Sequence, residues 1–354
     1  MRALVLHHAG EARVEDRPEP RDPGPGEVRL RVTRAGLCGT DATEYLAGPV
    51  LTPLDTRHTG SGVLGPVVLG HEFVGVVEDV GDGVDLAAGL RVAAGAGVWC
   101  GTCRWCAAGR TNLCASYWTA GLSADGGLAE RVTVPARMLV PLPDGLGDDD
   151  AALAQPLAVA LHAVDRAGVR PGDVVVVNGA GAIGSFVVVG AAAAGAARVV
   201  AVDVDPGRLQ AARELGATDV VDARSEDARA VVAEITGGDL ADVTVEASGL
   251  PTGLGTVQAL TRRGGTVLLV GLPKKPVELH SVDLVLREIT VATTVAHVCG
   301  ADLAPAVALL ARRPLAGLVV ERVVPLERAF DDALLPLSRG EARGKLLVDC
   351  GGAS

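Results

Sequence analysis

From residue 174 onward, the chain alternates short runs of valine, leucine and isoleucine with helical stretches. The run VVVV at 174–177 precedes an apolar helical pattern over 182–196, and RVVAVD at Arg198–Asp203 precedes a helix with Pro206 near its start. Further apolar runs follow at 243–247, 266–270 and 289–295. Continuous apolar strands separated by helices are typical of a parallel sheet covered on both faces. The sequence therefore predicts a doubly wound α/β domain.

The residues before about 155 have a different character, because glycine and proline interrupt them at short intervals. Alternating runs at 27–33, 73–80 and 130–134 indicate short strands. At 354 residues the chain exceeds the ~250–300 residues at which a single core stops growing. We predict a two-domain α/β protein, in which a mostly β domain (1–156) is followed by the doubly wound domain (157–295). The tail (296–354), with a helix at 303–311, is expected to return to the first domain.

A glycine motif, GAGAIG, follows the four valines and opens the predicted helix. Gly179 permits a tight turn, Gly181 lets the backbone approach a pyrophosphate, and Gly184 lets helix and strand pack closely. Asp203 ends the next strand, where a carboxylate binds the ribose 2′-hydroxyl of NAD and repels the 2′-phosphate of NADP. Arg208 lies one helical turn further on. This pattern predicts an NAD site, and the alternative is structural glycines with a helix-capping aspartate.

Composition excludes several other classes of protein. The net charge is −11 and no Lys/Arg cluster is present, so nucleic-acid binding is not expected. The first twenty residues become charged too early for a signal peptide, and no uninterrupted apolar run reaches the ~18–20 residues of a membrane span. We therefore expect a cytoplasmic protein without membrane partners.

Four of the seven cysteines lie in one loop, CGTCRWCAAGRTNLC. In a reducing compartment, clustered thiols indicate a metal site rather than disulfides, and the odd cysteine count agrees. Four sulfur ligands suit Zn²⁺ and leave no open position, so this ion would be structural. The alternatives are an iron–sulfur cluster and buried free thiols. The four candidate ligands are Cys100, Cys103, Cys106 and Cys114.

A second set of metal donors is spread along the sequence. Cys38 lies in GLCGTD, and His71 lies in LGHEFVG with Glu72 beside it. An incomplete set of protein ligands is typical of a catalytic zinc, because water or substrate fills the remaining position. Singly, each residue is more often structural.

Together these motifs resemble the zinc-dependent medium-chain alcohol dehydrogenases. The matching stretches, in the family's order, are PGPGEVRLRV, GLCGTD, GHEFVGVVEDVG, the cysteine loop, DGGLAERVTVP, PLAVALHAV and GAGAIG. CGTDATEYLAGP and PLAVALHAV are most similar to the 2,3-butanediol and sorbitol (polyol) dehydrogenases. The resemblance implies a Rossmann domain inserted in a GroES-like catalytic domain, with two zinc ions per subunit, one catalytic and one structural.

The resemblance also implies roles for individual residues. Cys38 and His71 would bind the catalytic zinc, Thr40 would take the substrate's hydroxyl proton, and Asp41 would orient His71. The four cysteines of the loop would hold the structural zinc. Residues expected to line the cofactor site are Gly179, Gly181, Ile183, Gly184, Asp203, Arg208 and Val270.

Two positions depart from the family's pattern. Where polyol-type relatives have a glutamate at the metal, this chain has Gln155, an uncharged and weaker ligand. We expect Glu72 to complete the zinc shell, with Gln155 near the metal; the alternative is a water between Gln155 and zinc. Where many relatives have a histidine for proton release, this chain has Thr43, which cannot titrate. The release route would then use water, Glu44 or His58.

The expected activity is oxidation of a secondary alcohol, a vicinal diol or polyol, to a ketone with NAD. A sugar or cyclitol dehydrogenase is the alternative within the family. Two alternatives from other classes are a catalytically decayed protein that binds NAD and zinc, and an enzyme that uses bound NAD in a non-redox cycle. We also expect a homo-oligomer, a dimer or tetramer, in which the last strand of the sheet pairs across a two-fold axis.

Overall fold

The computed structural model describes residues 1–273 and 275–351. The chain divides into two compact units. The first unit contains Met1–Ala158 and the residues from His297 onward, and the second contains Val159–Ala296. The helix α4 (Ala154–Ala167) includes the junction between them.

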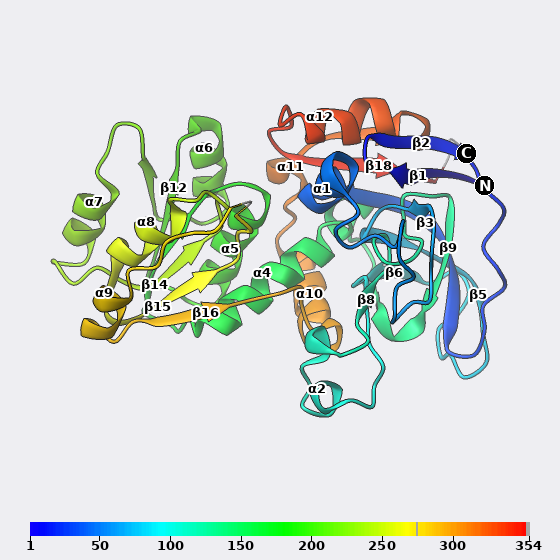
Figure 1. Cartoon of the computed structure of the whole chain (residues 1–354), viewed down its shortest axis with the longest axis horizontal. Coiled ribbons are helices and arrows are strands. Elements are labelled where there is room, and N and C mark those ends of the chain that lie inside the picture. The colour runs from blue at the N-terminus through cyan, green and yellow to red at the C-terminus, as the bar shows by residue number, and fades with distance from the viewer. Residues whose placement is uncertain (274, 352–354) are drawn as a thin grey trace. The chain divides into compact units, whose positions relative to one another are not determined.

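The second unit is built on six parallel strands in the order β13-β12-β11-β14-β15-β16 (Figure 1). This is the strand order of the Rossmann fold. The chain adds strands outward from β11 on one side and then, beginning with β14, on the other side. Its strands are β11 (Val174–Asn178), β12 (Arg198–Asp203), β13 (Asp219–Asp222), β14 (Ala241–Glu246), β15 (Thr261–Leu269) and β16 (Thr290–Thr293). Its helices are α5 (Ala182–Ala193), α6 (Pro206–Glu214), α7 (Ala228–Ile235), α8 (Gly253–Leu260) and α9 (Ser281–Leu286). The predicted doubly wound domain is confirmed.

Burial along the central strand explains why the strands of this sheet are continuous apolar runs. Val176 belongs to a cluster that includes Val232 of α7 and Leu260 of α8. Val175 and Val177 are also completely buried. Because alternate side chains of a strand point to opposite faces, both faces of β11 are covered.

The first unit is mostly β, as predicted. Its largest sheet runs β10-β6-β5-β3-β18-β17 with β9 also on β3, and smaller sheets are β2-β1-β4 and β7-β8. The strands are β1 (Arg2–His8), β2 (Glu11–Asp16), β3 (Glu27–Leu37), β4 (Val67–Val68), β5 (Glu72–Val80), β6 (Arg91–Ala94), β7 (Gly97–Val98), β8 (Trp118–Thr119), β9 (Arg131–Pro135), β10 (Leu139–Pro141), β17 (Val320–Pro325) and β18 (Lys345–Asp349). The helices are α1 (Gly39–Ala47), α2 (Arg104–Ala107), α3 (Asp148–Ala151), α10 (Ala304–Arg312), α11 (Ala316–Val319) and α12 (Leu335–Ser338).

The last strand lies inside the largest sheet rather than at its edge. β18 pairs antiparallel with β3 and parallel with β17, so segments from both ends of the chain lie side by side (Figure 1). Leu346 and Val348 join Leu30 and Val32 of β3 in one apolar core. This pairing places Lys345, the first residue of β18, next to Glu72 of β5.

In the part of the chain that the structure describes, no helix combines the length and apolar character that crossing a membrane requires.

Candidate functional site

The turn from β3 into α1 presents Cys38 and Thr40. Cys38 is the N-cap residue of α1, and its backbone N–H donates to Oδ2 of Asp41 at 2.8 Å. Asp41 thereby satisfies a backbone donor at the helix start, as capping residues do. The Cys38 thiol lies 3.8 Å from the Thr40 hydroxyl. The helix start therefore holds these two side chains beside each other.

His71 reaches the same place from the turn between β4 and β5. It follows Gly70, whose φ is +97° and where a Cβ would lie 2.6 Å from the backbone nitrogen of Leu128, so this turn requires glycine. Nδ1 of His71 lies 3.5 Å from Oδ1 of Asp41. Burial lowers the pKa of His71, but the Asp41 carboxylate outweighs it and raises the pKa well above its ordinary value. With Nδ1 directed at Asp41, Nε2 remains for a metal.

Glu72 begins β5, is 1% exposed, and forms an ion pair with Lys345, which is 6% exposed. Burial lowers the pKa of Lys345, but the charge of Glu72 outweighs it and the net shift is upward. A Cβ at Gly36 would overlap the Glu72 carboxylate, so the pair occupies space that this glycine leaves. Sequence reasoning missed Lys345, because no local spacing connects residue 345 with residue 72.

One ligand atom from each of Cys38, His71 and Glu72 lies within 4.8 Å of the others. A thiolate, an imidazole and a carboxylate are donors that Zn²⁺ accepts, and their buried convergence fits the ion. Gln155, also predicted near this metal, is the second residue of α4 and is half-buried.

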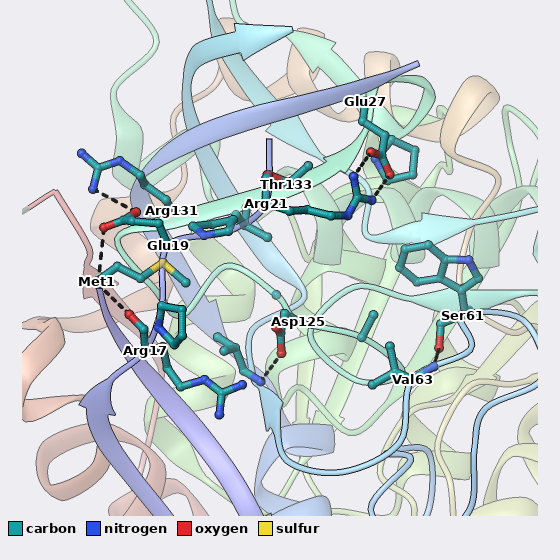
Figure 2. Close-up of a pocket in the computed structure, with 18 of the residues that line it drawn as sticks. Met1, Arg17, Glu19, Arg21, Glu27, Ser61, Val63, Asp125, Arg131 and Thr133 are labelled. Carbon is teal, nitrogen blue, oxygen red and sulfur yellow. Dashed lines mark hydrogen bonds and ion pairs between the residues drawn. The ribbon is translucent and has the colours of Figure 1, made fainter. Parts of the chain in front are cut away.

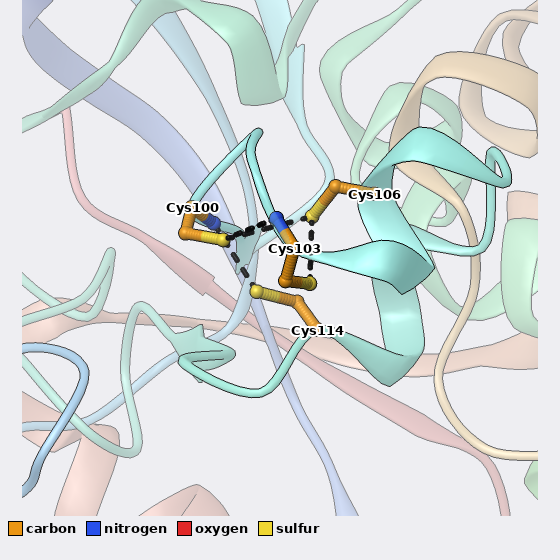
Figure 3. Close-up of side chains that lie close together, drawn as sticks. All are labelled: Cys100, Cys103, Cys106 and Cys114. Carbon is orange, nitrogen blue, oxygen red and sulfur yellow. Dashed lines mark hydrogen bonds between the residues drawn. The ribbon is translucent and has the colours of Figure 1, made fainter.

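The cysteine loop folds so that four sulfur atoms converge (Figure 3). Cys106 Sγ lies 3.9 Å from that of Cys100 and 3.6 Å from that of Cys103. Backbone N–H groups point at the sulfurs, including that of Cys100, which donates to Cys114 at 3.2 Å. The backbone N–H of Thr102 leads the contacts that lower the pKa of Cys100 to about 6, which favours the thiolate that binds metal. All seven cysteines are free thiols, so the set fits a four-sulfur zinc site and no disulfide.

The glycine turn has the geometry that each of its three roles requires. Gly179 has a φ of +98°, and a Cβ there would lie 2.7 Å from the nitrogen of Ser248. At Gly181, the N-cap of α5, a Cβ would meet no atom within 4 Å, so open space faces the helix start. A Cβ at Gly184 would overlap the Gly179 carbonyl oxygen. Ile183 lies in the first turn of α5, half-buried.

Asp203 both supports the fold and fits the cofactor role. Its Oδ2 accepts from the N–H of Ala180 at 2.7 Å, and its Oδ1 accepts from Val204 at 2.7 Å and from Asp205. The carboxylate therefore ties the end of β12 to the glycine turn. It does not cap α6, whose N-cap residue is Asp205. Nη1 of Arg208 lies 3.9 Å from its Oδ2.

Val270, also predicted beside the cofactor, directly follows β15 and donates its N–H to the backbone oxygen of Glu246 at 2.9 Å. It therefore lies at the carboxyl end of the sheet, the edge at which open α/β sheets bind ligands.

The two side chains predicted as routes of proton release, Glu44 and His58, already accept hydrogen bonds, and Thr43 donates one. The Thr43 hydroxyl donates to the Gly39 carbonyl oxygen at 2.9 Å. Glu44 accepts from the backbone of residues 50–52. Nδ1 of His58 accepts from the N–H groups of Gly60 and Ser61, both at 3.1 Å, which leaves its Nε2 uninvolved in these contacts.

A separate cavity of about 550 Å³ lies between the segment before β3 and the loop at residues 60–63 (Figure 2). Its charged side chains pair with neighbours: Arg21 binds Glu27 through two contacts of 2.6 Å, and Arg131 binds Glu78 at 2.9 Å. Cys38, His71 and Glu72 do not line it. The cavity is thus distinct from the cluster of metal donors.

Comparisons with known proteins agree with this geometry. Residues 24–144 match the alcohol dehydrogenase GroES-like domain, and residues 182–312 match the zinc-binding dehydrogenase domain. The (R,R)-butanediol dehydrogenase of Bacillus subtilis is 34% identical over 98% of this chain and 99% of its own. The sorbitol dehydrogenase of Gallus gallus is 36% identical over 98% of this chain and 96% of its own.

Solved structures that resemble this chain are also dehydrogenases. The crystal structure of 2R,3R-butanediol dehydrogenase from Bacillus subtilis has a TM-score of 0.91 and 33% identity, covering 98% of this chain and 99% of that one. A putative zinc-binding dehydrogenase from Sinorhizobium meliloti, bound to NADP, has a TM-score of 0.84 and 31% identity, covering 98% of both chains.

A Rossmann unit joined to a GroES-like unit with clustered metal donors defines an oxidoreductase that acts on CH–OH groups with a nicotinamide cofactor. The chain belongs to the zinc-binding medium-chain alcohol dehydrogenase family.

Proposed function

We propose that this enzyme oxidises a secondary alcohol, a vicinal diol or polyol, to the ketone with NAD. The observation that carries the proposal is the convergence of Cys38, His71 and Glu72 within 4.8 Å, with the Thr40 hydroxyl beside Cys38. Butanediol and sorbitol dehydrogenases are among its relatives, which supports a diol or polyol as substrate.

In this proposal the chain's residues bind, orient and move the proton. Zinc, when held by Cys38, His71 and Glu72, supplies Lewis acidity that lowers the pKa of an alcohol oxygen, and NAD accepts the hydride. Asp41 fixes the imidazole through Nδ1, and Lys345 neutralises the carboxylate of Glu72. Thr40 accepts the hydroxyl proton and releases its own. The reaction converts the alcohol and NAD⁺ into a ketone, NADH and one proton.

The choice of NAD rests on Asp203. Its carboxylate is 8% exposed at the end of β12, next to the glycine turn, where it accepts a ribose hydroxyl and repels a phosphate. The relative from Sinorhizobium meliloti is bound to NADP, so the preference is tested by comparing the two cofactors. We expect a lower KM for NAD, and Asp203→Ala to reduce that preference.

NADH absorbance with a panel of vicinal diols, polyols and simple alcohols tests the activity. Cys38→Ser should abolish turnover while NAD binding, measured by calorimetry, persists. Normal turnover in Cys38→Ser would refute the proposal. NAD and zinc binding without turnover of any alcohol would instead favour a catalytically decayed binding protein.

The two donor clusters support a proposal for the metal content. We infer one catalytic and one structural zinc per subunit, with Glu72 as a ligand of the first and Gln155 near it. Elemental analysis of the zinc content of wild type, Glu72→Ala and Gln155→Glu tests this set of ligands. Glu72→Ala with full zinc content and activity would exclude Glu72 as a ligand. Seven free thiols, four of them gathered for metal, also fit a reducing compartment and support a cytoplasmic location.

We further infer a homo-oligomer formed through the edge strand β16. In the sheet order β16 has a neighbour on one side only, which leaves a row of backbone donors and acceptors for pairing. Exposed apolar side chains lie on this strand and nearby, among them Val282, Val285, Leu286, Val291 and Val295. Light scattering of the wild type should give a dimer or tetramer, and Val291→Lys should shift it toward the monomer.

A further inference from the structure

The strand β14 ends on a buried carboxylate that the proposed reaction does not use. Glu246, its last residue, is 4% exposed. Its Oε1 accepts from the backbone N–H of Ser248 at 2.9 Å and from that of Gly249 at 3.2 Å, and it also binds the Ser248 hydroxyl. In the described residues, the partners of this carboxylate are backbone N–H groups and one hydroxyl rather than a cation. A buried carboxylate depends on such hydrogen bonds to stabilise its charge, so Glu246 holds this loop firmly.

The loop that Glu246 holds lies against the glycine turn of the predicted cofactor site. A Cβ at Gly179 would lie 2.7 Å from the nitrogen of Ser248 and 2.8 Å from its Cα. The N–H of Ala247 donates to the backbone oxygen of Asn178 at 2.9 Å. A shift of the backbone at 247–248 would therefore change the space beside Gly179.

The same residue also fixes the segment that follows β15. The backbone oxygen of Glu246 accepts from the N–H groups of Val270 and Gly271, both at 2.9 Å. A Cβ at Gly271 would overlap Oε2 of Glu246, so the carboxylate occupies the space that this glycine leaves. Val270 is one of the residues expected to line the cofactor site. Glu246 therefore connects the segments that follow β14 and β15.

Two acidic residues flank the glycine turn in the same way. The turn follows β11, which lies between β12 and β14. Asp203 ends β12 and accepts from the N–H of Ala180, whereas Glu246 ends β14 and holds its loop against Gly179. Open α/β sheets bind ligands at the carboxyl ends of the strands where the chain begins to add strands on the other side, here β11 and β14. The segments that Glu246 holds thus lie at the edge of the sheet where a dinucleotide is expected.

We propose that Glu246 is a positioning residue for the nicotinamide cofactor, which holds the segments 247–249 and 270–271 in the conformation that binds NAD. This inference rests on the proposed function, because it concerns the same cofactor. A preformed site binds its ligand more tightly, since the loops need not be ordered when the ligand arrives. Glu246 acts through the backbone of these segments.

The experiment measures the Kd for NAD by calorimetry in zinc-loaded protein. Glu246→Gln should raise the Kd by about tenfold, the factor that a hydrogen bond to a charged group contributes to an equilibrium constant. The reason is that an NH₂ group replaces one oxygen that faces backbone donors. In the cofactor-free protein, the amides of Ser248 and Gly249 should exchange hydrogen faster. Zinc content should not change, and kcat at saturating NAD should not fall.

Two glycines of α8 provide a second, matched pair of variants. A Cβ at Gly253 would overlap Oε1 of Glu246, so Gly253→Ala displaces the carboxylate without altering its charge and should also raise the Kd for NAD. A Cβ at Gly255 meets no atom of the described chain within 4 Å, so Gly255→Ala should leave the Kd unchanged. This pair decides the question if Glu246→Gln does not fold.

Asp242→Asn is the control for a purely structural effect. Asp242 lies near the other end of β14, where it accepts from the N–H of Val174 at 2.7 Å and pairs with Arg262 at 2.7 Å. The substitution changes a carboxylate to an amide in the same strand but far from the glycine turn. It should lower the melting temperature and leave the Kd for NAD unchanged.

An unchanged Kd for NAD in Glu246→Gln and Gly253→Ala would overturn the inference and leave the proposed function intact. An equal rise in Asp242→Asn would also overturn it, because the effect would then follow from general destabilisation. A wild type that binds NAD but oxidises no alcohol would overturn the proposed function, whereas the Kd values would still decide the inference.

Discussion

Replacement of Lys345 by methionine should destabilise the first unit, because it leaves the Glu72 carboxylate buried without a counter-charge. Both side chains are at least 94% buried, from exposures of 1% and 6%. At a contact of ~3 Å and an effective dielectric constant of ~20, their attraction is about 5 kcal/mol. Loss of one partner of a buried pair typically costs about 3–5 kcal/mol. We expect a loss in this range for the zinc-free protein.

Tryptophan fluorescence during urea unfolding measures this loss in one unit. All three tryptophans, Trp99, Trp105 and Trp118, lie in the first unit, so their signal reports that unit and not the Rossmann unit. With a urea dependence of roughly 2 kcal/mol per M, the midpoint should fall by roughly 1.5–2.5 M. The double variant Glu72→Gln/Lys345→Met lacks both charges of this pair and should recover most of the lost stability.

Zinc makes the same experiment informative about Glu72. If Glu72 is a metal ligand, the ion's positive charge replaces that of Lys345, and the zinc-loaded Lys345→Met protein should lose less stability than the zinc-free one. Equal losses with and without zinc would count against Glu72 as a ligand. A midpoint shift of Lys345→Met below about 0.3 M without zinc, or a double variant no more stable than the single one, would refute the reasoning.

Further substitutions test the other sites. Cys106→Ser should reduce zinc from two ions to one per subunit by elemental analysis and lower the melting temperature, because a sulfur ligand of the structural ion is lost. Gly181→Ala should fold normally, since its Cβ meets no protein atom, but should weaken NAD binding tenfold or more by calorimetry, because the Cβ occupies space needed by the pyrophosphate. Burial raises the pKa of Asp148, but the hydrogen bond with Thr33 and the charge of Arg91 outweigh it and lower the pKa. Its contribution to stability is therefore present above pH ~4 and lost as the pH falls through the folded-state pKa, so Asp148→Asn should flatten the acid unfolding curve followed by fluorescence.

The sequence predicted the Rossmann sheet well because its signals are local. The strand β12 has the predicted bounds, and β11 extends one residue beyond its predicted end. Predictions were less accurate where packing decides at which residue a strand begins or ends. β15 begins at Thr261, five residues before the predicted start, and β16 (Thr290–Thr293) is shorter than the predicted run at 289–295.

The candidate metal site was predictable only as a set of donor types. Resemblance and spacing identified Cys38, His71 and Glu72, which the structure brings together. The contacts of two buried charged residues in the same unit were not predicted. Lys345 reaches Glu72 through the pairing of β18 with β3, and Glu44 reaches residues 50–52 through a loop closure, so neither contact leaves a periodic pattern in the sequence.

The placement of β18 within the largest sheet has a consequence for biosynthesis. Every element of the Rossmann unit has left the ribosome before β18 is translated, so that unit can begin to fold as an independent domain. The sheet around β3 must instead wait for a strand from the other end of the chain, and until it arrives β3 lacks one neighbour and Glu72 lacks its counter-ion. Nascent chains stalled before residue 345 should therefore carry a protease-resistant cofactor domain attached to an immature metal-binding one.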